Sequence, residues 1–418
     1  MSLDTDIAVV GGGLAGASLA LAVAEVGLSV TLIEAKPFAV PDDPAVRERT
    51  TALSFGTRVL FERLGLWSAI GDSAAPIERL HVSQKASLGR VTVDAGEYDL
   101  PALGYVASNT AMLEAMLRRI EAEPSIAVMA PASFESLETT EQGVDLTLRE
   151  GEEANSRETR TLTAGLIVGA DGAGSAVRQA LGIGAKRDDY KQRALISTVT
   201  PECPHGGTAF ERFTPDGPIA VLPRSESTCA LVWTLPPERA HKMETAESVE
   251  FEAALAEQFG TRLGKLRLTG PRGSYPLART LCDTTVARRG VLIGNAGHSL
   301  HPAAAQGFNL AVRDALTLAA TLAEHKHLYS NEFDPGDPDM LGAWAEARQP
   351  DQQRIANFTD LIVRTFSNRL PGLSAIRAAA LIGLSLSPTT RHDIARRSMG
   401  LALAPALDDM LQTESRCV

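Results

Sequence analysis

The chain has 418 residues, of which 44% are hydrophobic and 22% are charged, so it can bury a large core and should form two or three domains. Its formal net charge of −11 argues against a general affinity for nucleic acid. Cys203, Cys229, Cys282 and Cys417 form no CxxC pair, so neither a zinc site nor a disulfide framework is expected. The acidic N-terminus leads directly into a strand, and no apolar run is long enough to span a bilayer. A cytoplasmic location is therefore expected.

The first nucleotide-type turn lies close to the N-terminus. Residues 6–10 are typical of a buried strand, residues 11–16 (GGGLAG) fit GxGxxG, and a second strand ends at Glu34. In this order the first glycine permits a tight turn, the second lets the backbone approach a pyrophosphate, and the third lets the helix pack on the strand. The acid about 20 residues further on can bind ribose hydroxyls. The pattern predicts a dinucleotide site, and Glu34 favours FAD or NAD over NADP.

The middle of the chain contains a second glycine turn, after which the predicted elements are mainly short strands. Residues 166–172 form an apolar strand that runs into a glycine turn, where Asp171 either contacts a cofactor or caps the following helix. Arg49 is either a cofactor contact or a solvated surface charge. Short strands expected at 195–199, 208–213, 219–222 and 229–234 indicate an inserted, mostly antiparallel sheet, and residues 236–259 are expected to be helical.

The third turn lies between residues 291 and 316. An apolar strand at 291–293 breaks at Gly294, and a helical pattern starts at about Phe308. A strand, a glycine loop and a helix N-terminus in this order are typical of an anion site. Helices are expected from residue 341 to the end, where residues 354–397 carry seven arginines and two acids among apolar residues. These helices either lie on an anionic membrane surface or pack on the body of the protein with their arginines in solvent.

The three turns together resemble the flavin-dependent aromatic hydroxylases of the para-hydroxybenzoate hydroxylase type, over nearly the whole chain. Residues 81–106, 209–223 (AFERFTPDGPIAVLP) and 231–240 (LVWTLPPERA) are similar to the ubiquinone-biosynthesis branch, in particular to hydroxylases of 2-octaprenyl-6-methoxyphenol. The resemblance implies an α/β fold: a Rossmann-like FAD-binding domain with an inserted mainly antiparallel β-sheet substrate domain and a helical C-terminal region. The expected parts are residues 1–75, 106–185 and 285–345 (FAD-binding), 76–105 and 186–284 (substrate), and 346–418 (C-terminal helices).

The resemblance also implies which residues bind FAD. The pyrophosphate would lie against the first loop, at Gly11, Gly13, Leu14, Ala15 and Gly16. Glu34 would bind the adenosine ribose, and Arg49 would lie along the cofactor. Asp171 and Gly172 would touch FAD and take part in the use of the pyridine nucleotide. The third loop would hold the ribityl chain and border the isoalloxazine, through Gly294, Asn295, Pro302, Gln306, Gly307, Phe308 and Asn309.

The chain departs from the family pattern at two positions. Asn295 replaces an aspartate, but an amide oxygen can still accept a hydrogen bond from a ribityl hydroxyl. Ala305 stands where a glycine beside the flavin ring is usual, and its methyl group could restrict the backbone or crowd the ring. FAD binding is still expected with Asn295. Ala305 makes catalytic turnover harder to predict than FAD binding.

The activity implied is an FAD-dependent monooxygenase that uses O₂ and NADH or NADPH and hydroxylates a polyprenylated phenol through a flavin C4a-hydroperoxide. The alternatives are another ring position, a small soluble phenol, a weakly catalytic flavin-binding assembly protein, or a flavin reductase of isoprenoid double bonds. A peripheral position at the inner face of the membrane, a contact with a biosynthetic complex through the C-terminal helices, and a homo-oligomer are further expectations. No catalytic acid or base is identified: His298 and His301 are expected to pack in the loop, and Tyr190 and Tyr275 either touch substrate or pack in the core.

Overall fold

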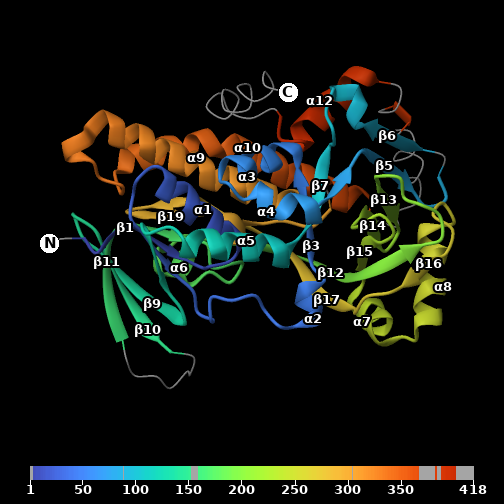
Figure 1. Ribbon diagram of the computed structural model, residues 1–418, viewed down its shortest axis with the longest axis horizontal. Coiled ribbons are helices and arrows are strands. Elements are labelled where there is room, and N and C mark those ends of the chain that lie inside the picture. Colours follow the sequence, from blue (N-terminus) through green and yellow to red (C-terminus); the bar gives the residue numbers. More distant parts are fainter. Residues whose placement is uncertain are drawn as a thin grey trace.

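Two large β-sheets lie side by side with a small third sheet between them (Figure 1). This computed structural model describes residues 3–87, 89–151, 159–303, 305–366, 382–383 and 387–401. The first sheet has a parallel centre and is packed against helices, and the second is mainly antiparallel. The predicted α/β fold with an inserted antiparallel sheet is confirmed.

The parallel centre of the first sheet brings the three glycine-rich turns together. β11 (Thr159–Gly169) pairs in parallel with both β1 (Thr5–Val10) and β19 (Gly290–Leu292), so the carboxyl ends of the three strands lie side by side. The turns that begin at residues 11, 170 and 293 directly follow these ends, which is where open α/β sheets bind nucleotides. The sheet is completed by β2 (Val30–Ile33), β8 (Ile126–Met129), β9 (Ala132–Thr139), β10 (Val144–Glu150) and β18 (Val286–Ala287).

Helices α1 (Leu14–Glu25), α5 (Asn109–Glu121), α9 (Gln306–Tyr329) and α10 (Pro338–Phe366) cover one face of this sheet (Figure 1). Helix α1 is apolar all round because it is enclosed by the sheet, α5 and α9, and residues 16–24 are all buried. The remaining short helices are α2 (Pro44–Arg47), α3 (Phe55–Arg63), α4 (Trp67–Ile70), α6 (Ala176–Ala180), η1 (Gly71–Ser73), η2 (Ala95–Tyr98) and η4 (Ser330–Glu332).

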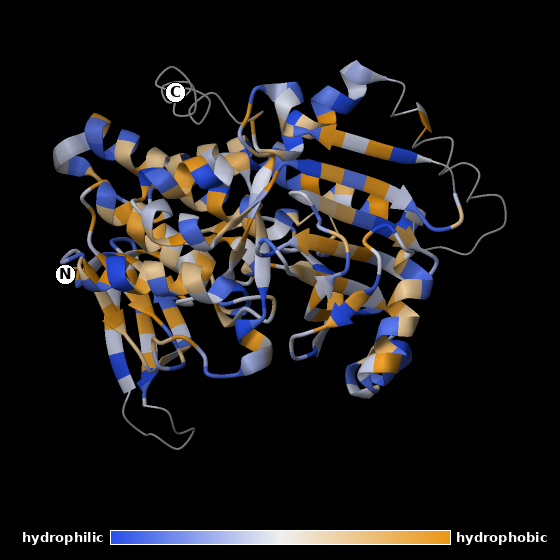
Figure 2. Cartoon of the chain, turned by 45° about the vertical axis from the view of Figure 1, so that its right-hand side comes forward, coloured by the Kyte–Doolittle hydropathy of each residue, from blue (hydrophilic) through white to orange (hydrophobic). Residues whose placement is uncertain are grey.

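The second sheet presents one face to helices and the other to the interior of the molecule. Its strand order is β20-β17-β12-β15-β14-β13-β5-β6, with β16 also paired to β12. All its pairings are antiparallel except that of β13 with β5. Hydrophobic and hydrophilic residues alternate along several of its strands (Figure 2). The bounds are β5 (Arg79–Gln84), β6 (Arg90–Asp94), β12 (Ala185–Pro201), β13 (Thr208–Thr214), β14 (Gly217–Pro223), β15 (Cys229–Leu235), β16 (Leu266–Leu268), β17 (Gly273–Cys282) and β20 (His298–Ser299).

The outer face of the second sheet packs on α7 (Pro237–Thr245) and α8 (Ser248–Phe259). Trp233 on β15 and Phe251 on α8 are fully buried in this core, with their rings edge to face. The sequence predicted one helical stretch over residues 236–259, whereas the structure has two helices. The reason is Ala246, whose backbone is extended at φ −61° and ψ 152° and ends α7.

The small third sheet consists of β3 (Thr50–Ser54), β7 (Gly104–Ser108) and β4 (Ala75–Ile77), paired in antiparallel fashion. Near the C-terminus, α10 and α12 (Pro388–Ser398) are helical as expected, while the predictions for Leu370, Leu373, Ile376 and Cys417 lie outside the described residues. Within the described part of the chain, none of the helices combines the length and apolar character that crossing a membrane requires.

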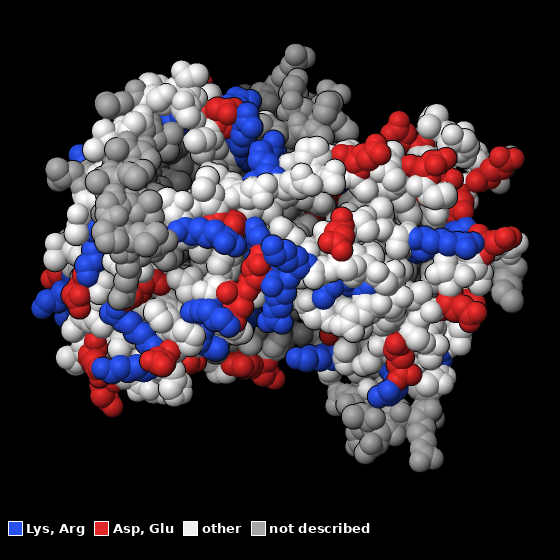
Figure 3. All heavy atoms as spheres, turned by 180° about the vertical axis from the view of Figure 1, so that it is seen from behind, with Lys and Arg blue, Asp and Glu red and all other residues white. Residues whose placement is uncertain are grey.

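Surface charges lie close to charges of the opposite sign. On the face shown in Figure 3, basic and acidic side chains stand next to one another over most of the visible surface. Exposed pairs such as Arg47 with Asp42, 2.8 Å apart, contribute at most about 1 kcal/mol each because water screens them. The stability of the fold therefore depends mainly on its buried contacts.

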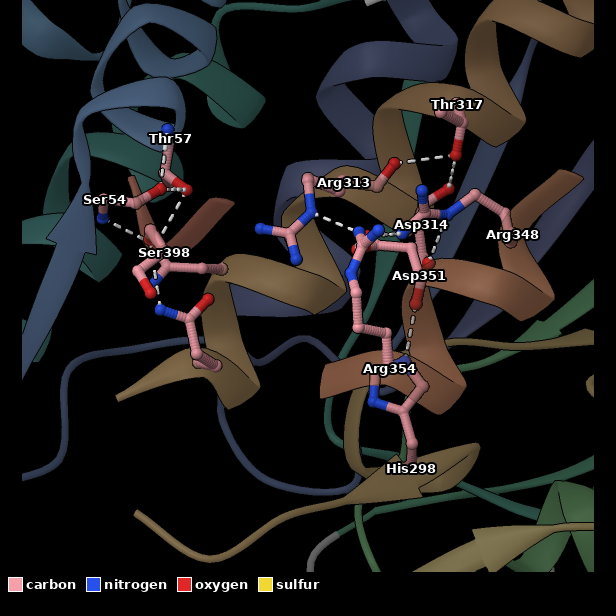
Figure 4. Close-up of polar contacts among 12 residues, drawn as sticks. Ser54, Thr57, His298, Arg313, Asp314, Thr317, Arg348, Asp351, Arg354 and Ser398 are labelled. Atoms are coloured by element: carbon pink, nitrogen blue, oxygen red, sulfur yellow. Dashed lines mark hydrogen bonds and ion pairs between the residues drawn. The ribbon is translucent and has the colours of Figure 1, made fainter. Parts of the chain in front are cut away.

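A buried network of charges joins α9 and α10 to β20, which follows β19 in the chain (Figure 4). Asp314 accepts hydrogen bonds from His298 Nε2 at 2.5 Å and from Arg348 Nε at 2.7 Å. Arg348 and Arg313 both donate to Asp351 Oδ2, at 2.7 Å and 3.0 Å. Burial disfavours the ionised form of Asp314, but Arg348 and His298 outweigh it and lower the pKa of this carboxyl. The charges are tolerated in the interior because each has a partner.

We expect the change Asp314→Asn to destabilise the protein by about 3 kcal/mol, because it leaves Arg348 buried beside a neutral amide. The change Asp42→Asn, on a fully exposed aspartate of a surface pair, should alter stability by less than about 1 kcal/mol. Thermal and urea unfolding of the two variants beside the wild type would measure the difference. Equal midpoints for the two variants would show that the buried network does not stabilise the fold.

Candidate active site

The first loop has the backbone geometry of a dinucleotide cradle. Gly11 has φ +108°, a conformation that side chains disfavour. A Cβ added to Gly16 would lie 1.9 Å from the carbonyl oxygen of Gly11, so only glycine lets α1 pack this closely. A Cβ added to Gly13 would meet no atom within 4 Å, so space lies open beside the N-terminus of α1. Leu14 and Ala15 belong to the first turn of this helix, whose N–H groups have no acceptor within the helix. These features fit a bound pyrophosphate.

Glu34 follows β2 and lies beside this loop. Its carboxylate accepts hydrogen bonds from the backbone N–H of Gly12 at 2.7 Å and of Lys36 at 3.1 Å. These two bonds hold the carboxylate at the carboxyl edge of the sheet, next to the glycine loop. A ribose hydroxyl placed there would still find an acceptor, because a carboxylate can accept about four hydrogen bonds.

Asp171 follows β11 and caps helix α6. It accepts hydrogen bonds from Ser175 Oγ at 2.5 Å and from the backbone N–H of Ala176 at 2.7 Å. Of the two roles that the sequence left open for Asp171, its contacts within the protein are those of a helix cap. Gly172, at φ +86°, turns the chain at the same edge of the sheet as the first loop.

The third loop turns the chain from β19 through η3 (Gly294–Ala296) into the N-terminus of α9. Gly294 has φ +56°, and Asn295 is exposed at the wall of the central cavity. Pro302, Gln306, Gly307 and Phe308 line the same cavity. Gln306 donates to the carbonyl oxygen of Ser398 at 3.2 Å, while its own Oε1 is buried without a partner among the described residues.

Asn309 lines the same cavity, and its side chain is also bonded to protein on all sides. Its Oδ1 accepts from the backbone N–H of Ser54 at 2.9 Å and from Thr57 Oγ1 at 2.7 Å. Its Nδ2 donates to the carbonyl oxygens of Ala52 at 3.0 Å and of Ala305 at 2.8 Å. The side chain is 1% exposed and its hydrogen-bonding groups contact protein, so it fixes α9 against β3 and α3.

Ala305 precedes α9 in the left-handed conformation, with φ 48° and ψ 33°. This is the conformation that a glycine would adopt freely, and it strains an alanine by about 1–2 kcal/mol. The methyl group therefore leaves the turn intact at a modest energetic cost.

A cavity of about 990 Å³ lies between the third loop and the inner face of the second sheet. This volume is at the upper end of the range for small-molecule sites. Apolar side chains of the sheet and of the C-terminal helices form most of the wall; they include Val82, Val91, Val93, Leu222, Val232, Phe358, Ile362, Ile394 and Met399. The glycine loop at residues 11–16 is outside this wall. The cavity thus offers an apolar chamber beside the loop that the flavin ring would border.

Arg49 and Tyr275 stand together at the cavity wall. The guanidinium carbon of Arg49 lies 5.2 Å from the centroid of the Tyr275 ring, within reach of a cation–π contact. Arg49 is exposed, and its backbone carbonyl accepts a hydrogen bond from the N–H of Asn109 at 3.0 Å. Burial raises the pKa of the Tyr275 hydroxyl, so it stays protonated.

His301 and Tyr190 pack edge to face, with ring centroids 5.1 Å apart. The backbone N–H of Ala303 donates to His301 Nδ1 at 3.0 Å, which places the proton of the neutral ring on Nε2. Burial lowers the pKa of His301 to about 4, so the ring is neutral at physiological pH. Tyr190 donates to Asp360 Oδ1 at 3.0 Å and is thereby held on α10.

Glu211 on β13 also lines the cavity, and it is not among the site residues predicted from the sequence. Burial raises the pKa of its carboxyl to about 7. A signal was present in the sequence, because period-two alternation puts Ala209, Glu211 and Phe213 on one face of the strand. A single acid between apolar residues on one face indicates a carboxyl directed into an apolar space.

Comparison with known proteins agrees with these features. Residues 4–357 match the family of FAD-binding domains. Ubiquinone hydroxylase UbiL of Rhodospirillum rubrum is 33% identical over 96% of this chain and 91% of its own length. The 3-demethoxyubiquinol 3-hydroxylase of Escherichia coli is 32% identical over 95% of this chain and 99% of its own length.

A solved structure with the same fold is p-nitrophenol 4-monooxygenase PnpA from Pseudomonas putida, with a TM-score of 0.75 and 17% identity over 96% of this chain and 99% of that one. At this level of identity the likeness concerns the fold alone. The assignment to a family rests on the family match and on the two sequence relatives. The chain belongs to the FAD-binding family of monooxygenases that includes the ubiquinone-biosynthesis hydroxylases, and it is an FAD-dependent aromatic hydroxylase.

Proposed function

We propose that this enzyme hydroxylates a polyprenylated phenol of ubiquinone biosynthesis, of the 2-octaprenyl-6-methoxyphenol type. The observation that carries the proposal is the large apolar cavity beside the third loop. The flavin ring and a phenol ring would share the volume of about 990 Å³, and the apolar wall formed by the second sheet and the C-terminal helices suits an isoprenoid chain. A hydroxylase of small soluble phenols would gain little from so much apolar wall.

The ring position is a separate choice within this proposal. One relative is named for 3-demethoxyubiquinol, which is hydroxylated at another ring position, so that position is the second candidate. The names of the relatives support the ubiquinone pathway and leave both candidates in place. Feeding each phenol to a strain that lacks this gene's product and identifying the quinone intermediate that accumulates would separate them.

In this proposal FAD lies along the carboxyl edge of the first sheet. Its pyrophosphate contacts the first loop, its adenosine ribose contacts Glu34, and Asp171 and Gly172 lie next to it. Arg49 runs along the cofactor, and the segment from Gly294 to Asn309 holds the ribityl chain and borders the ring. The bound flavin supplies the redox chemistry with NADH or NADPH and O₂, while the protein supplies position and a chamber that excludes water.

The exposed end of the cavity is proposed to face the membrane surface. Leu361 on α10 lines the cavity and is 65% exposed, so it places an apolar side chain where the cavity meets solvent. Arg396 and Arg397 on α12 are exposed, and residues of the same helix line the cavity as well. An apolar entrance next to basic side chains suits a substrate that leaves a bilayer with anionic headgroups.

We expect Gly13→Ala to weaken FAD binding about tenfold or more, which corresponds to roughly 1.4 kcal/mol. The added methyl group meets no protein atom within 4 Å, so the fold should be retained while the space for the pyrophosphate is lost. Gly342→Ala on α10 is the matched control, since a Cβ there also meets no atom within 4 Å. Fluorescence titration of the apoproteins with FAD measures the effect, and equal affinities for the two variants would contradict the placement of the pyrophosphate.

Anaerobic mixing of the flavin-loaded enzyme with NADH or NADPH tests the substrate class. We expect 2-prenyl-6-methoxyphenol to accelerate bleaching of the flavin absorbance about tenfold or more, because a filled apolar chamber excludes water from the site. 4-Nitrophenol, a small soluble phenol, is the comparison. Acceleration by 4-nitrophenol alone would favour a soluble substrate instead.

Vesicles with anionic headgroups should bind the protein, and added salt should weaken binding because it screens the arginines. We expect Leu361→Ser to lower the bound fraction several-fold, whereas Leu328→Ser on α9, with a leucine that is 66% exposed, should leave it unchanged. Co-sedimentation with vesicles measures both. Equal binding by the two variants would show that the entrance of the cavity does not face the bilayer.

A further inference from the structure

One carboxyl group stands in the middle of an otherwise apolar row that crosses the second sheet. Pairing places Glu211 opposite Val82 of β5 on one side and opposite Ala220 of β14 on the other. The row continues to Val91 of β6 beyond Val82, and beyond Ala220 to Val232 of β15 and then Ile196 of β12. All six residues line the cavity. The strands therefore hold the Glu211 carboxyl on the cavity side of the sheet.

Glu211 differs from the other carboxyl group at the cavity. Glu48 is bonded to Arg224 and to Thr198, so its charge is compensated. The side-chain carboxyl of Glu211 makes no hydrogen bond or ion pair with any residue of the described chain. Along its own strand, the neighbours on the same face are Ala209 and Phe213.

The other ionisable groups at the cavity do not neutralise Glu211. Arg391 is paired with Glu97 at 2.8 Å, Arg49 lies over Tyr275, and His301 is neutral. On β5 and β14 the residues opposite Glu211 carry no charge. Burial is accordingly the sole cause of the raised pKa, which lies near 7. A carboxyl that changes its charge close to neutral pH is suited to accept and return a proton.

We propose that the Glu211 carboxylate accepts the hydrogen bond and then the proton of the phenolic hydroxyl of the substrate. The inference rests on the proposed function, because it takes the substrate to be a phenol. The O–H bond of the phenol breaks, an O–H bond forms on the carboxylate, and the electron pair stays on the phenolate oxygen. The phenolate ring is richer in electrons and therefore more reactive toward an electrophilic oxygen. When the aromatic ring is restored, the hydroxylated carbon loses its proton to water and the C–H electron pair re-forms the phenolate. Glu211 then returns its proton to the phenolate oxygen and ends the cycle ionised.

An ionised carboxyl at position 211 destabilises the folded protein, which argues that this carboxyl has a use in the reaction. The folded pKa of Glu211 is raised above its ordinary value of about 4.5, so ionisation opposes folding as the pH rises from that value toward 7. Glutamine has nearly the same shape and no charge. Glu211→Gln should therefore fold at least as well as the wild type at pH 8, and its loss of function could not be attributed to unfolding.

The test is calorimetric binding of 2-prenyl-6-methoxyphenol to the flavin-loaded enzyme at pH 6 and pH 8, in two buffers of different ionisation enthalpy. At pH 6 most of the carboxyl is protonated, so phenol binding should release close to one proton. The affinity should rise about tenfold from pH 6 to pH 8, in proportion to the ionised fraction. The phenol itself, with a pKa of about 10, stays neutral over this range.

Four controls make the result specific. Glu211→Gln should bind the phenol without proton release and with equal affinity at both pH values, and Glu211→Asp should keep part of the pH dependence. Glu226→Gln, on the exposed turn between β14 and β15, should behave as the wild type. The O-methylated phenol, which has no proton to give, should show no pH dependence with any variant. With O₂ and NADPH, kcat/KM of the wild type should rise through pH 7, and Glu211→Gln should lose roughly 100-fold.

The possible results distinguish the role of Glu211 from the proposed function of the enzyme. Phenol binding by the wild type without proton release at pH 6, or proton release that Glu211→Gln preserves, would overturn the role of Glu211 and leave the proposed function standing. Failure of the flavin-loaded wild type to bind the phenol at either pH would overturn both.

Discussion

The buried carboxylate of Asp314 joins three segments that are far apart in the sequence. It binds His298 on β20, within the third loop region, and Arg348 on α10, and it is itself part of α9. Each partner is needed because an uncompensated charge at this depth would destabilise the fold by several kcal/mol. The loop that borders the cavity is therefore held against the two long helices, and the same contact fixes both the packing of α9 and the shape of the site.

Asn309 holds the other end of this loop. Its amide binds Ser54 and Thr57 beside β3, and it also binds Ala305 at the turn into α9. With His298 before the turn and Asn309 after it, the strained backbone of Ala305 is fixed from both sides. A site whose walls are fixed before the substrate enters loses less conformational entropy when the substrate binds. The hydrogen bonds that stabilise the fold thus also preorganise the cavity.

Features that depend on neighbouring residues could be predicted from the sequence. The glycine loop after β1, the strands that end at Gly169 and Leu292, and the inserted sheet all follow from local spacing and alternation. Contacts set by the packing of distant segments could not be predicted in this way. Nothing near Asn309 in the sequence indicates that its partners are residues 52–57. The role of His298 becomes evident only when its partner Asp314 is seen about two turns into α9.

Glu211 lies between these two cases. Alternation alone assigns it to the same face as Ala209 and Phe213, but the meaning of that face depends on which strands stand beside β13. Had β13 paired with a strand that carried an arginine opposite Glu211, the acid would have been an ordinary ion pair. The parallel pairing with β5 places Val82 there instead. A sequence with one acid on an apolar face can be interpreted fully only once the register of the neighbouring strands is known.

Asp314 and Glu211 show how the surroundings of a carboxyl group decide whether it serves the structure or the reaction. Arg348 and His298 hold Asp314 ionised, so its charge stays constant over the physiological pH range and can support the loop. Glu211 has apolar neighbours and a pKa near 7, so its charge changes readily when another group offers or takes a proton. A phenol in the cavity would supply the partner that the protein does not. The fold thus places a fixed charge behind the third loop and a variable one opposite it, across the chamber in which the substrate is proposed to bind.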